Sequence, residues 1–206
     1  MMHTFEHMRL HPERPQIRQL KHAAKLLHDG CFAIVPTETT YAIMVLPTAL
    51  KAQESIRQLR NLDDKHLWSL VVSDLKQAAQ FVSIDNPSHR ILKHYLPGPY
   101  TFILPANSKL PKRIFGKRKD VGIRMPDHAV CNMLLQEVGE PLLATSMQFP
   151  DEDFIATDPE TIEPRIKHLN AVLLDAGWGD MTPTTVVDLC DDVPQVLRQG
   201  LGGWET

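Results

Sequence analysis

The sequence predicts an α/β fold, and two patterns support that class. Short apolar runs rich in β-forming residues alternate with segments of helical periodicity along the whole chain. The last two apolar runs, 184–189 and 194–198, have no helix between them, so we expect a mixed parallel and antiparallel sheet. Because the sequence has no internal repeat or linker, we expect one domain at 15–200, an N-terminal arm at 1–14 and a tail at 201–206.

Each expected element has a local reason. Strands are predicted where β-forming apolar residues run together between turn residues. The expected strands are 31–35, 67–72, 100–104, 121–125, 141–146, 171–175, 184–189 and 194–198. Helices are predicted where a proline or a capping side chain precedes an apolar pattern of helical period. The expected helices start at Pro15, Thr48, Ser73 or Asp74, Pro87, Asp127 and Asp158–Pro159. Glycines at 200, 202 and 203 predict a flexible tail.

The composition narrows the class of protein. The chain has 206 residues, of which 43% are hydrophobic, enough for a sizeable core. Its net charge of −3 means that any binding to nucleic acid would depend on a local basic patch. The three cysteines are widely spaced, which argues against a disulfide framework and a cysteine zinc site. With no apolar run approaching about 18 residues and no apolar signal core, we expect a soluble, cytoplasmic protein without membrane association.

The N-terminal arm carries three histidines, His3, His7 and His11. Their spacing of four would place them on one face of a helix, as a metal site requires. However, Pro12 and Pro15 crowd the segment, and no carboxylate or cysteine completes a ligand set. We therefore expect a loosely held arm and no metal site.

The chain is organised around one stretch, Gly30–Ile43. Its apolar run 31–35 reads as a buried strand, and Pro36 ends that strand because it has no N–H to donate. Five hydrogen-bonding side chains then follow at 37–41. Taken alone, this stretch favours a turn capped by threonine hydroxyls, but ligands also bind at strand ends of α/β sheets. Both interpretations stay open at this point.

Hydroxyl residues recur at the ends of predicted strands, and arginines accompany them. The hydroxyl residues are Thr37, Thr101, Thr145 with Ser146, and Thr184 with Thr185. The arginines are Arg60, Arg124 and Arg198. If these groups converge, they suit a ligand with carboxylate, hydroxyl or phosphate groups, because arginine offers a bidentate fork. The alternative is that each threonine caps its own turn and each arginine lies on the surface. No Walker loop, dinucleotide fingerprint, zinc-protease or serine-hydrolase motif is present.

The run Lys109–Lys119 is strongly basic. Six of its eleven residues are lysine or arginine and none is acidic, which stands out in a net-acidic chain. It has a turn signal and little periodicity, so we expect an exposed loop. Such a loop is either a solvated surface or a contact for a polyanion. The candidate RNA-binding residues are Lys112, Arg113, Lys117, Arg118 and Lys119.

Six short motifs follow one another in a fixed order. They are P-T-E-T-T-Y at 36–41, P-G-P-Y-T at 97–101, V-G-I-R-M-P at 121–126, P-L-L-A-T-S at 141–146, P-T-T-V-V-D at 183–188 and V-L-R-Q-G at 196–200. Each motif is weak alone, whereas the ordered set is specific. On these motifs the chain resembles the YrdC-like family over roughly residues 15 to 200.

The resemblance implies a fold and a reaction. The family has a single-domain fold in which a twisted, mixed sheet is flanked by helices and presents a concave basic face. Its best-known activity is synthesis of threonylcarbamoyl-AMP from L-threonine, bicarbonate and ATP, with Mg²⁺ carried on the nucleotide. The product feeds formation of threonylcarbamoyladenosine in tRNA. Binding to double-stranded RNA is also associated with the family.

The resemblance also assigns roles to residues of this sequence. Thr37, Thr101, Thr145 and Thr184 would contact the threonine or its carbamate. The residues expected to hold the nucleotide and its phosphates are Arg60, Lys65, Arg124, Ser146, Gln148 and Arg198.

Two positions depart from the synthases. Gln58 replaces the lysine of a K-x-R pair, and Gln148 replaces the asparagine of an S-x-N motif. An amide at 58 cannot neutralise a phosphate oxygen, although Arg57 or Lys65 could compensate. These departures, with the basic run, resemble the YciO branch of the family. Two hypotheses follow: a threonylcarbamoyl-AMP synthase, or an RNA-binding or translation-associated protein on the same fold that has little or no synthase activity.

Overall fold

The computed structural model describes residues 4–63 and 66–205. Within them a single ten-stranded sheet has the order β1-β8-β2-β3-β7-β4-β6-β5-β9-β10. The strands are β1 Phe5–Arg9, β2 Phe32–Pro36, β3 Tyr41–Val45, β4 Ser69–Val71, β5 Tyr100–Pro105, β6 Asp120–Arg124, β7 Leu142–Ser146, β8 Ala171–Asp175, β9 Thr185–Asp188 and β10 Gln195–Arg198. The helices are α1 Ile17–His28, α2 Leu50–Arg60, α3 Leu75–Ala78, α4 Asn86–Tyr95, α5 Lys112–Phe115, α6 Ala129–Val138 and α7 Pro159–Ile166.

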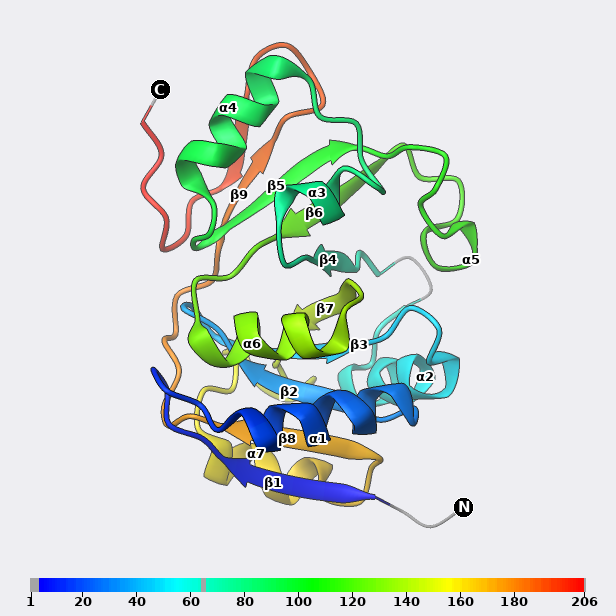
Figure 1. Ribbon diagram of the computed structural model, residues 1–206, viewed down its shortest axis with the longest axis vertical. Coiled ribbons are helices and arrows are strands. Elements are labelled where there is room, and N and C mark those ends of the chain that lie inside the picture. Colours follow the sequence, from blue (N-terminus) through cyan, green and yellow to red (C-terminus); the bar gives the residue numbers. More distant parts are fainter. Residues whose placement is uncertain (1–3, 64–65, 206) are drawn as a thin grey trace.

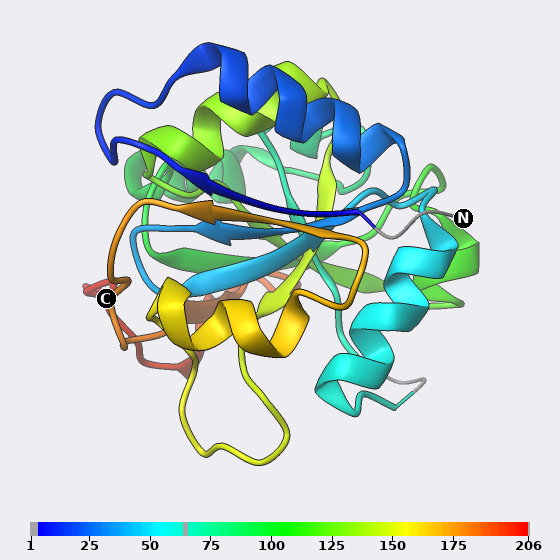
Figure 2. The same cartoon turned by 90° about the horizontal axis from the view of Figure 1, so that it is seen from below.

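The sheet is mixed, which confirms the expected class. β8 pairs parallel with β1 and β2, whereas β3 pairs antiparallel with β2 and β7. The last two strands pair antiparallel with each other, as expected of runs that no helix separates. Helices flank the sheet: Figures 1 and 2 show α1 and α6 together on one face of its β1–β8–β2 half and α7 on the other.

The core has two sides because β2 is buried on both faces. Phe32 and Ile34 pack in one hydrophobic cluster, and Ala33 and Val35 pack in the second, below α1 and α6. This division follows from the alternation of side chains along a strand. A strand with helices on both sides is a continuous apolar run rather than an alternating one. That is why the run 31–35 could be read from the sequence.

The N-terminal segment differs from expectation. Residues 5–9 form β1, which pairs parallel with β8 at the edge of the sheet, so this segment is not loosely held. His7 explains part of this: its Nδ1 lies 2.6 Å from Glu163 Oε2, and its Nε2 lies 2.9 Å from Asp175 Oδ2. The His11 ring accepts from the backbone N–H groups of residues 13 and 14. His3 lies outside the described residues.

The C-terminal tail is also held, contrary to its glycine content. Thr185 Oγ1 donates to Gly202 O at 2.6 Å, and Tyr100 Oη donates to Gly203 O at 2.6 Å. The Trp204 ring stacks on Tyr95, with 4.7 Å between ring centroids. A Cβ at Gly202 would lie 2.5 Å from the Tyr100 ring, so glycine here permits close packing rather than mobility.

Some caps and elements were predicted wrongly. Neither Thr48 nor Asp127 caps a helix: Ala49 and His128 hold those positions, and neither cap has a side-chain hydrogen bond. Asp158 does cap α7, because its carboxylate accepts from Glu160 N. The strand β3 was not predicted at all. The basic run contains the short helix α5, whose Phe115 is buried.

Candidate functional site

A cavity of about 290 Å³ gathers most of the predicted site residues. It is bounded by the turn after β2, the segment before β4, the starts of β5 and β9, and the ends of β6, β7 and β10. Its lining residues are Thr39, Thr40, His66, Leu67, Ser69, Thr101, Arg124, Ala144, Thr145, Ser146, Gln148, Ile155, Pro183, Thr184 and Arg198. Hydroxyls and two of the arginines, which are far apart in the sequence, therefore converge, which is one of the two alternatives that the sequence left open.

Arg60, the last residue of α2, does not line the cavity but binds two residues that do. Its Nη1 donates to Thr145 Oγ1 at 3.2 Å, to Ser146 Oγ at 3.1 Å and to the Ser146 carbonyl. Its Nε is buried without a hydrogen-bond partner in the described part of the chain. Burial lowers the pKa of the Arg60 guanidinium, but arginine titrates so high that it stays a cation at neutral pH. Arg60 thus fixes both hydroxyls that end β7 and places positive charge beside them.

Arg124 enters from the end of β6 and is almost fully buried. Its Nη2 donates to Thr39 Oγ1 at 3.3 Å and lies 3.7 Å from Glu38 Oε1. The other oxygen of Glu38 accepts from Asp127 N at 3.2 Å. Burial raises the pKa of the Glu38 carboxyl, and the charge of Arg124 partly offsets that rise. Arg124 is therefore held in place by a buried acidic partner on one side and a hydroxyl on the other.

Arg198 approaches from β10 and binds the start of β9. Its Nε and Nη2 donate to Thr184 O at 3.1 and 2.9 Å, and Nη2 also donates to Thr184 Oγ1 at 3.1 Å. The hydroxyls of Thr184 and Thr101 share a hydrogen bond of 2.9 Å. Burial and then the charge of Arg124 lower the pKa of Arg198. Two guanidiniums that repel each other at one cavity favour an anion between them.

His66 was not predicted, yet it lines the cavity. Its Nε2 lies 3.0 Å from Thr145 Oγ1, the hydroxyl that also receives Arg60. Burial lowers the pKa of His66 to about 4, with further lowering by the charges of Arg60 and Arg57. The imidazole is therefore neutral at neutral pH. No sequence signal marks this histidine, because it belongs to none of the six motifs.

Thr37 is buried in the turn after β2 and does not line the cavity. Its Oγ1 donates to Thr40 O at 2.6 Å, and it lies 3.0 Å from Thr39 Oγ1. Because Thr37 uses its proton on Thr40, Thr39 donates to Thr37 and accepts from Arg124. The structure thus has the capped turn, with Thr39 at the cavity. A contact between Thr37 and a substrate stays a prediction.

The two glutamines that depart from the synthases lie in different places. Gln148 lines the cavity, and its Nε2 donates to Glu152 O at 3.3 Å. Gln58 is exposed on α2, where its Nε2 donates to Glu54 Oε1 at 3.2 Å. Lys65, which was expected to help hold the nucleotide, lies outside the described residues.

The basic run divides into two parts. Lys112, Lys117 and Lys119 are exposed, as expected of an RNA-binding or solvated surface. Arg118 is only half exposed and lines a second cavity. Arg113 belongs to α5, and its side chain lies outside the described part of the structure. The basic character of a concave face stays a prediction.

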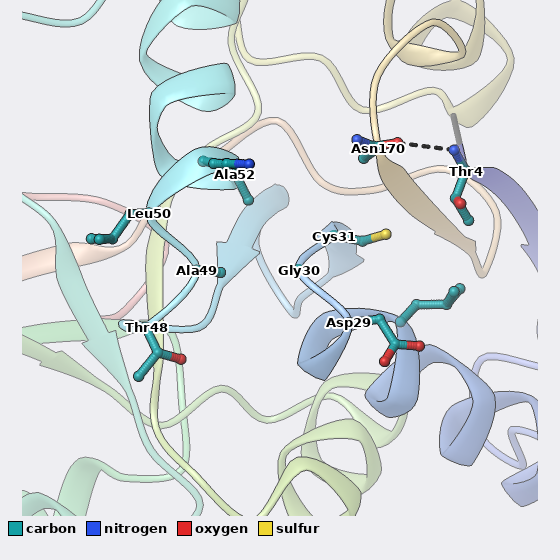
Figure 3. Close-up of a pocket in the computed structure, with 11 residues that line it drawn as sticks. Thr4, Asp29, Gly30, Cys31, Thr48, Ala49, Leu50, Ala52 and Asn170 are labelled. Carbon is teal, nitrogen blue, oxygen red and sulfur yellow. Dashed lines mark hydrogen bonds between the residues drawn. The ribbon is translucent and has the colours of Figure 1, made fainter. Parts of the chain in front are cut away.

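A larger cavity, of about 660 Å³, lies between the end of α1 and the start of α2 (Figure 3). Thr4 N donates to Asn170 Oδ1 at 2.9 Å on its wall, and Cys31 lies beside Gly30. None of the predicted site residues lines it. Burial raises the pKa of the Cys31 thiol, which leaves it a poor nucleophile at neutral pH. The smaller polar cavity is therefore the candidate site.

Helices long and apolar enough to cross a bilayer are absent from residues 4–63 and 66–205. The same residues contain no group of three histidine, cysteine, aspartate or glutamate side chains that could hold a metal ion.

A mixed sheet flanked by helices, with hydroxyls and arginines from distant segments around one polar cavity, defines an α/β domain with a cationic candidate site. Comparison with known proteins then shows the family to which this domain belongs. The chain belongs to the Sua5/YciO/YrdC family, whose model, described as telomere recombination, matches residues 25–200.

Individual relatives agree with this family. An uncharacterized protein of Haemophilus influenzae is 37% identical over 195 residues, and the match covers 94% of each chain. The uncharacterized protein YciO of Escherichia coli is 36% identical with the same coverage, and its crystal structure superposes with a TM-score of 0.89 over 98% of each chain. The threonylcarbamoyl-AMP synthase of Vibrio vulnificus is 25% identical, over 89% of this chain and all of the relative.

A more distant structure shares the fold. The structure of Sua5 from P. abyssi in complex with L-threonine has a TM-score of 0.83 at 22% identity, covering 96% of this chain and 57% of that one. The expected family, its YciO-like branch and its fold are therefore confirmed.

Proposed function

We propose that this protein makes threonylcarbamoyl-AMP, or a close carbamoyl adenylate, from L-threonine, bicarbonate and ATP. One observation carries the proposal: Arg124 and Arg198 line one cavity together with several hydroxyls, and Arg60 donates to two of those hydroxyls, Thr145 and Ser146. A reaction between a carboxylate-bearing substrate and a triphosphate needs fixed positive charge more than a protein nucleophile. The family includes threonylcarbamoyl-AMP synthases, one of which is 25% identical to this chain.

The side chains divide naturally between the two substrates. Thr101, Thr145 and Thr184 offer hydroxyls that suit the carboxylate, hydroxyl and carbamate of threonine. The three arginines, Ser146 and Gln148 would hold the nucleotide and its phosphates. The Mg²⁺ would arrive on the nucleotide, because this ion usually keeps substrate phosphates and waters among its ligands.

The positive field at the cavity favours this chemistry. The threonine amine must be neutral before it can react with the carbon dioxide that bicarbonate supplies and become a carbamate. Nearby cations disfavour an ammonium, as they disfavour the protonated form of His66. The carbamate, once formed, is an anion that the arginines stabilise. The geometry therefore favours both the reactive form of the amine and the product of its first step.

The test is a synthesis assay with purified protein, ATP, bicarbonate and labelled L-threonine. We expect a labelled adenylate and an equal amount of pyrophosphate. Arg60→Gln should lower kcat/KM by about a hundredfold or more, because the fixed charge on Thr145 and Ser146 is lost. Arg18→Gln, a matched change at an exposed position of α1, should leave the rate unchanged. Absence of adenylate and pyrophosphate, even with downstream tRNA-modifying proteins added, would refute the proposal.

A second function is favoured by a specific observation. Lys112, Lys117 and Lys119 are exposed on one short segment, which suits contact with the phosphates of duplex RNA. Changing all three to glutamine should weaken binding to a duplex RNA. It should also reduce the dependence of log K on log salt by roughly two to three, if each lysine contacts one phosphate. An unchanged salt dependence would exclude this surface as the RNA site.

A further inference from the structure

A second cavity, of about 280 Å³, adjoins the candidate site. Four residues line both cavities: Leu67, Ser69, Thr101 and Arg198. Beyond them the second cavity is lined by Trp68, Ile103, Arg118, Asp120, Val121, Gly122 and Val186. The two cavities therefore share a wall, and Arg198 contributes a cation to both.

Arg118 is the residue that distinguishes this cavity. It comes from the basic run, but unlike Lys117 and Lys119 it is half buried and faces the cavity wall. Its charge also reaches the first cavity, where it adds to burial and to Arg60 and Arg57 in lowering the pKa of His66. Arg118 and Arg198 thus place two cations on a cavity next to the candidate site.

Gly122 keeps the shared wall open. A Cβ at this position would lie 3.1 Å from Thr101 Cγ2 and 3.2 Å from Ser69 Oγ, which are both closer than ordinary contacts. Thr101 and Ser69 are the two hydroxyl side chains that line both cavities. A side chain at 122 would therefore press on the wall through which a bound molecule would extend from one cavity to the other.

We propose that Arg118 and Arg198 bind the polyphosphate end of the nucleotide in this second cavity. The inference rests on the proposed function. It adds Arg118, which lies outside the six motifs shared with the family, to the cations of the site. The amide at 58, where the synthases have lysine, is exposed and pairs with Glu54. Arg118 brings positive charge to the site from a different element. The Asp120 carboxylate lines the same cavity, which suits a polyphosphate that arrives with Mg²⁺.

This role fits the proposed reaction. A carbamate oxygen forms a bond to the α-phosphorus, the bond from that phosphorus to the bridging oxygen breaks, and the electron pair leaves with pyrophosphate. Charge therefore builds up on the leaving group, where a bidentate guanidinium stabilises it. A small ligand is favoured over RNA backbone here because Arg118 lies in a cavity, whereas the neighbouring lysines project into solvent.

The experiment measures binding of inorganic tripolyphosphate to the full-length protein by calorimetry, at fixed ionic strength. Arg118→Gln should weaken binding by about tenfold or more. Arg18→Gln removes the same charge from an exposed position of α1 and should change the affinity by less than about twofold. Gly122→Ala leaves the charge unaltered and should also weaken binding, since it crowds the shared wall. Melting temperatures of the variants establish that they are folded.

The outcomes separate this inference from the proposed function. Equal affinities of Arg118→Gln and Arg18→Gln for tripolyphosphate would overturn it. A loss of duplex RNA binding in Arg118→Gln with unchanged tripolyphosphate affinity would overturn it as well, and assign Arg118 to an RNA surface. A selective loss of tripolyphosphate binding in a protein that makes no adenylate would support the phosphate site and reject the proposed reaction.

Discussion

The cavity arginines and the lysines of the basic run are both cations, but the protein holds them differently. Arg60 and Arg124 are largely buried, Arg198 lies on an exposed strand, and each has hydroxyl or carbonyl partners that fix its orientation. The exposed lysines Lys112, Lys117 and Lys119 lie on a short helix and the loop that follows it. Fixed, desolvated charges can stabilise one transition state, whereas exposed charges act at longer range and are screened by salt. Four experiments test this difference.

The largest effect is expected at Arg124. Arg124→Gln removes a nearly buried charge 3.7 Å from Glu38 and leaves that carboxylate without its cation. Stability should fall by roughly 3 kcal/mol, and adenylate synthesis by about a hundredfold or more. The double variant Glu38→Gln/Arg124→Gln should regain most of the stability but none of the activity. Recovery of activity in the double variant would show that Arg124 acts only as a structural partner of Glu38.

A smaller loss is expected from Thr184→Val, which keeps the shape of the side chain. It removes the hydroxyl that accepts from Arg198 and bonds to Thr101. We expect kcat/KM for threonine to fall about tenfold, because one or two net hydrogen bonds are lost. Thr161→Val, at an exposed position of α7, is the matched control. Steady-state kinetics with varied threonine concentration compare the two variants. Equal kcat/KM values for Thr184→Val and Thr161→Val would show that Thr184 is not part of the site.

The pH dependence of stability tests the burial of His66 next to the cavity and, to a lesser extent, the effect of the nearby arginines. Its pKa is lowered to about 4 in the folded protein, so the unfolded chain takes up a proton first as the pH falls. The contribution of His66 is fully present above its unfolded value near 6.5 and is lost between that value and about 4. His66→Gln should therefore flatten this part of the stability profile, measured by denaturant unfolding. His168→Gln, at an exposed position, should not change the slope.

The smallest effect on chemistry is expected from the lysines. The triple change of Lys112, Lys117 and Lys119 to glutamine should alter adenylate synthesis by less than about twofold at physiological salt. A large loss would mean that the basic run takes part in catalysis, and the distinction between the two sets of cations would fail. The same protein, tested for RNA binding, separates the two proposed functions.

Part of the fold could be predicted because some of its strands are buried on both faces. The runs 31–35 and 171–175 are continuous and apolar, and both are central strands of the sheet. The strand β3 was missed because it follows a cluster of polar residues that reads as a turn. It pairs with the nearby β2 across the turn at 37–40 and with the distant β7, and only the second pairing leaves no local signal.

The motifs named several residues that line the candidate cavity, but the sequence could not show how those residues are arranged. Thr101, Thr145 and Thr184, which were expected to contact the substrate, line the cavity, whereas Thr37 is buried in the turn and Thr39, two residues further on, lines the cavity in its place. His66 and the cavity position of Arg118 could not be inferred, because burial depends on tertiary packing rather than on neighbours in the chain. The same limit applied to the tail, where glycine permits close approach to Tyr100.

That tail has a practical consequence for anyone who attaches a label or fusion partner to this protein. Gly202 and Gly203 accept hydrogen bonds from Thr185 and Tyr100, which lie in the strands that carry the Thr184 and Thr101 side of the cavity. A bulky fusion that pulls Trp204 away from Tyr95 would loosen β5 and β9 at their starts, which border the cavity. Affinity tags and fluorophores attached to this tail would therefore disturb the site. The label itself would then change the activity that it is used to measure.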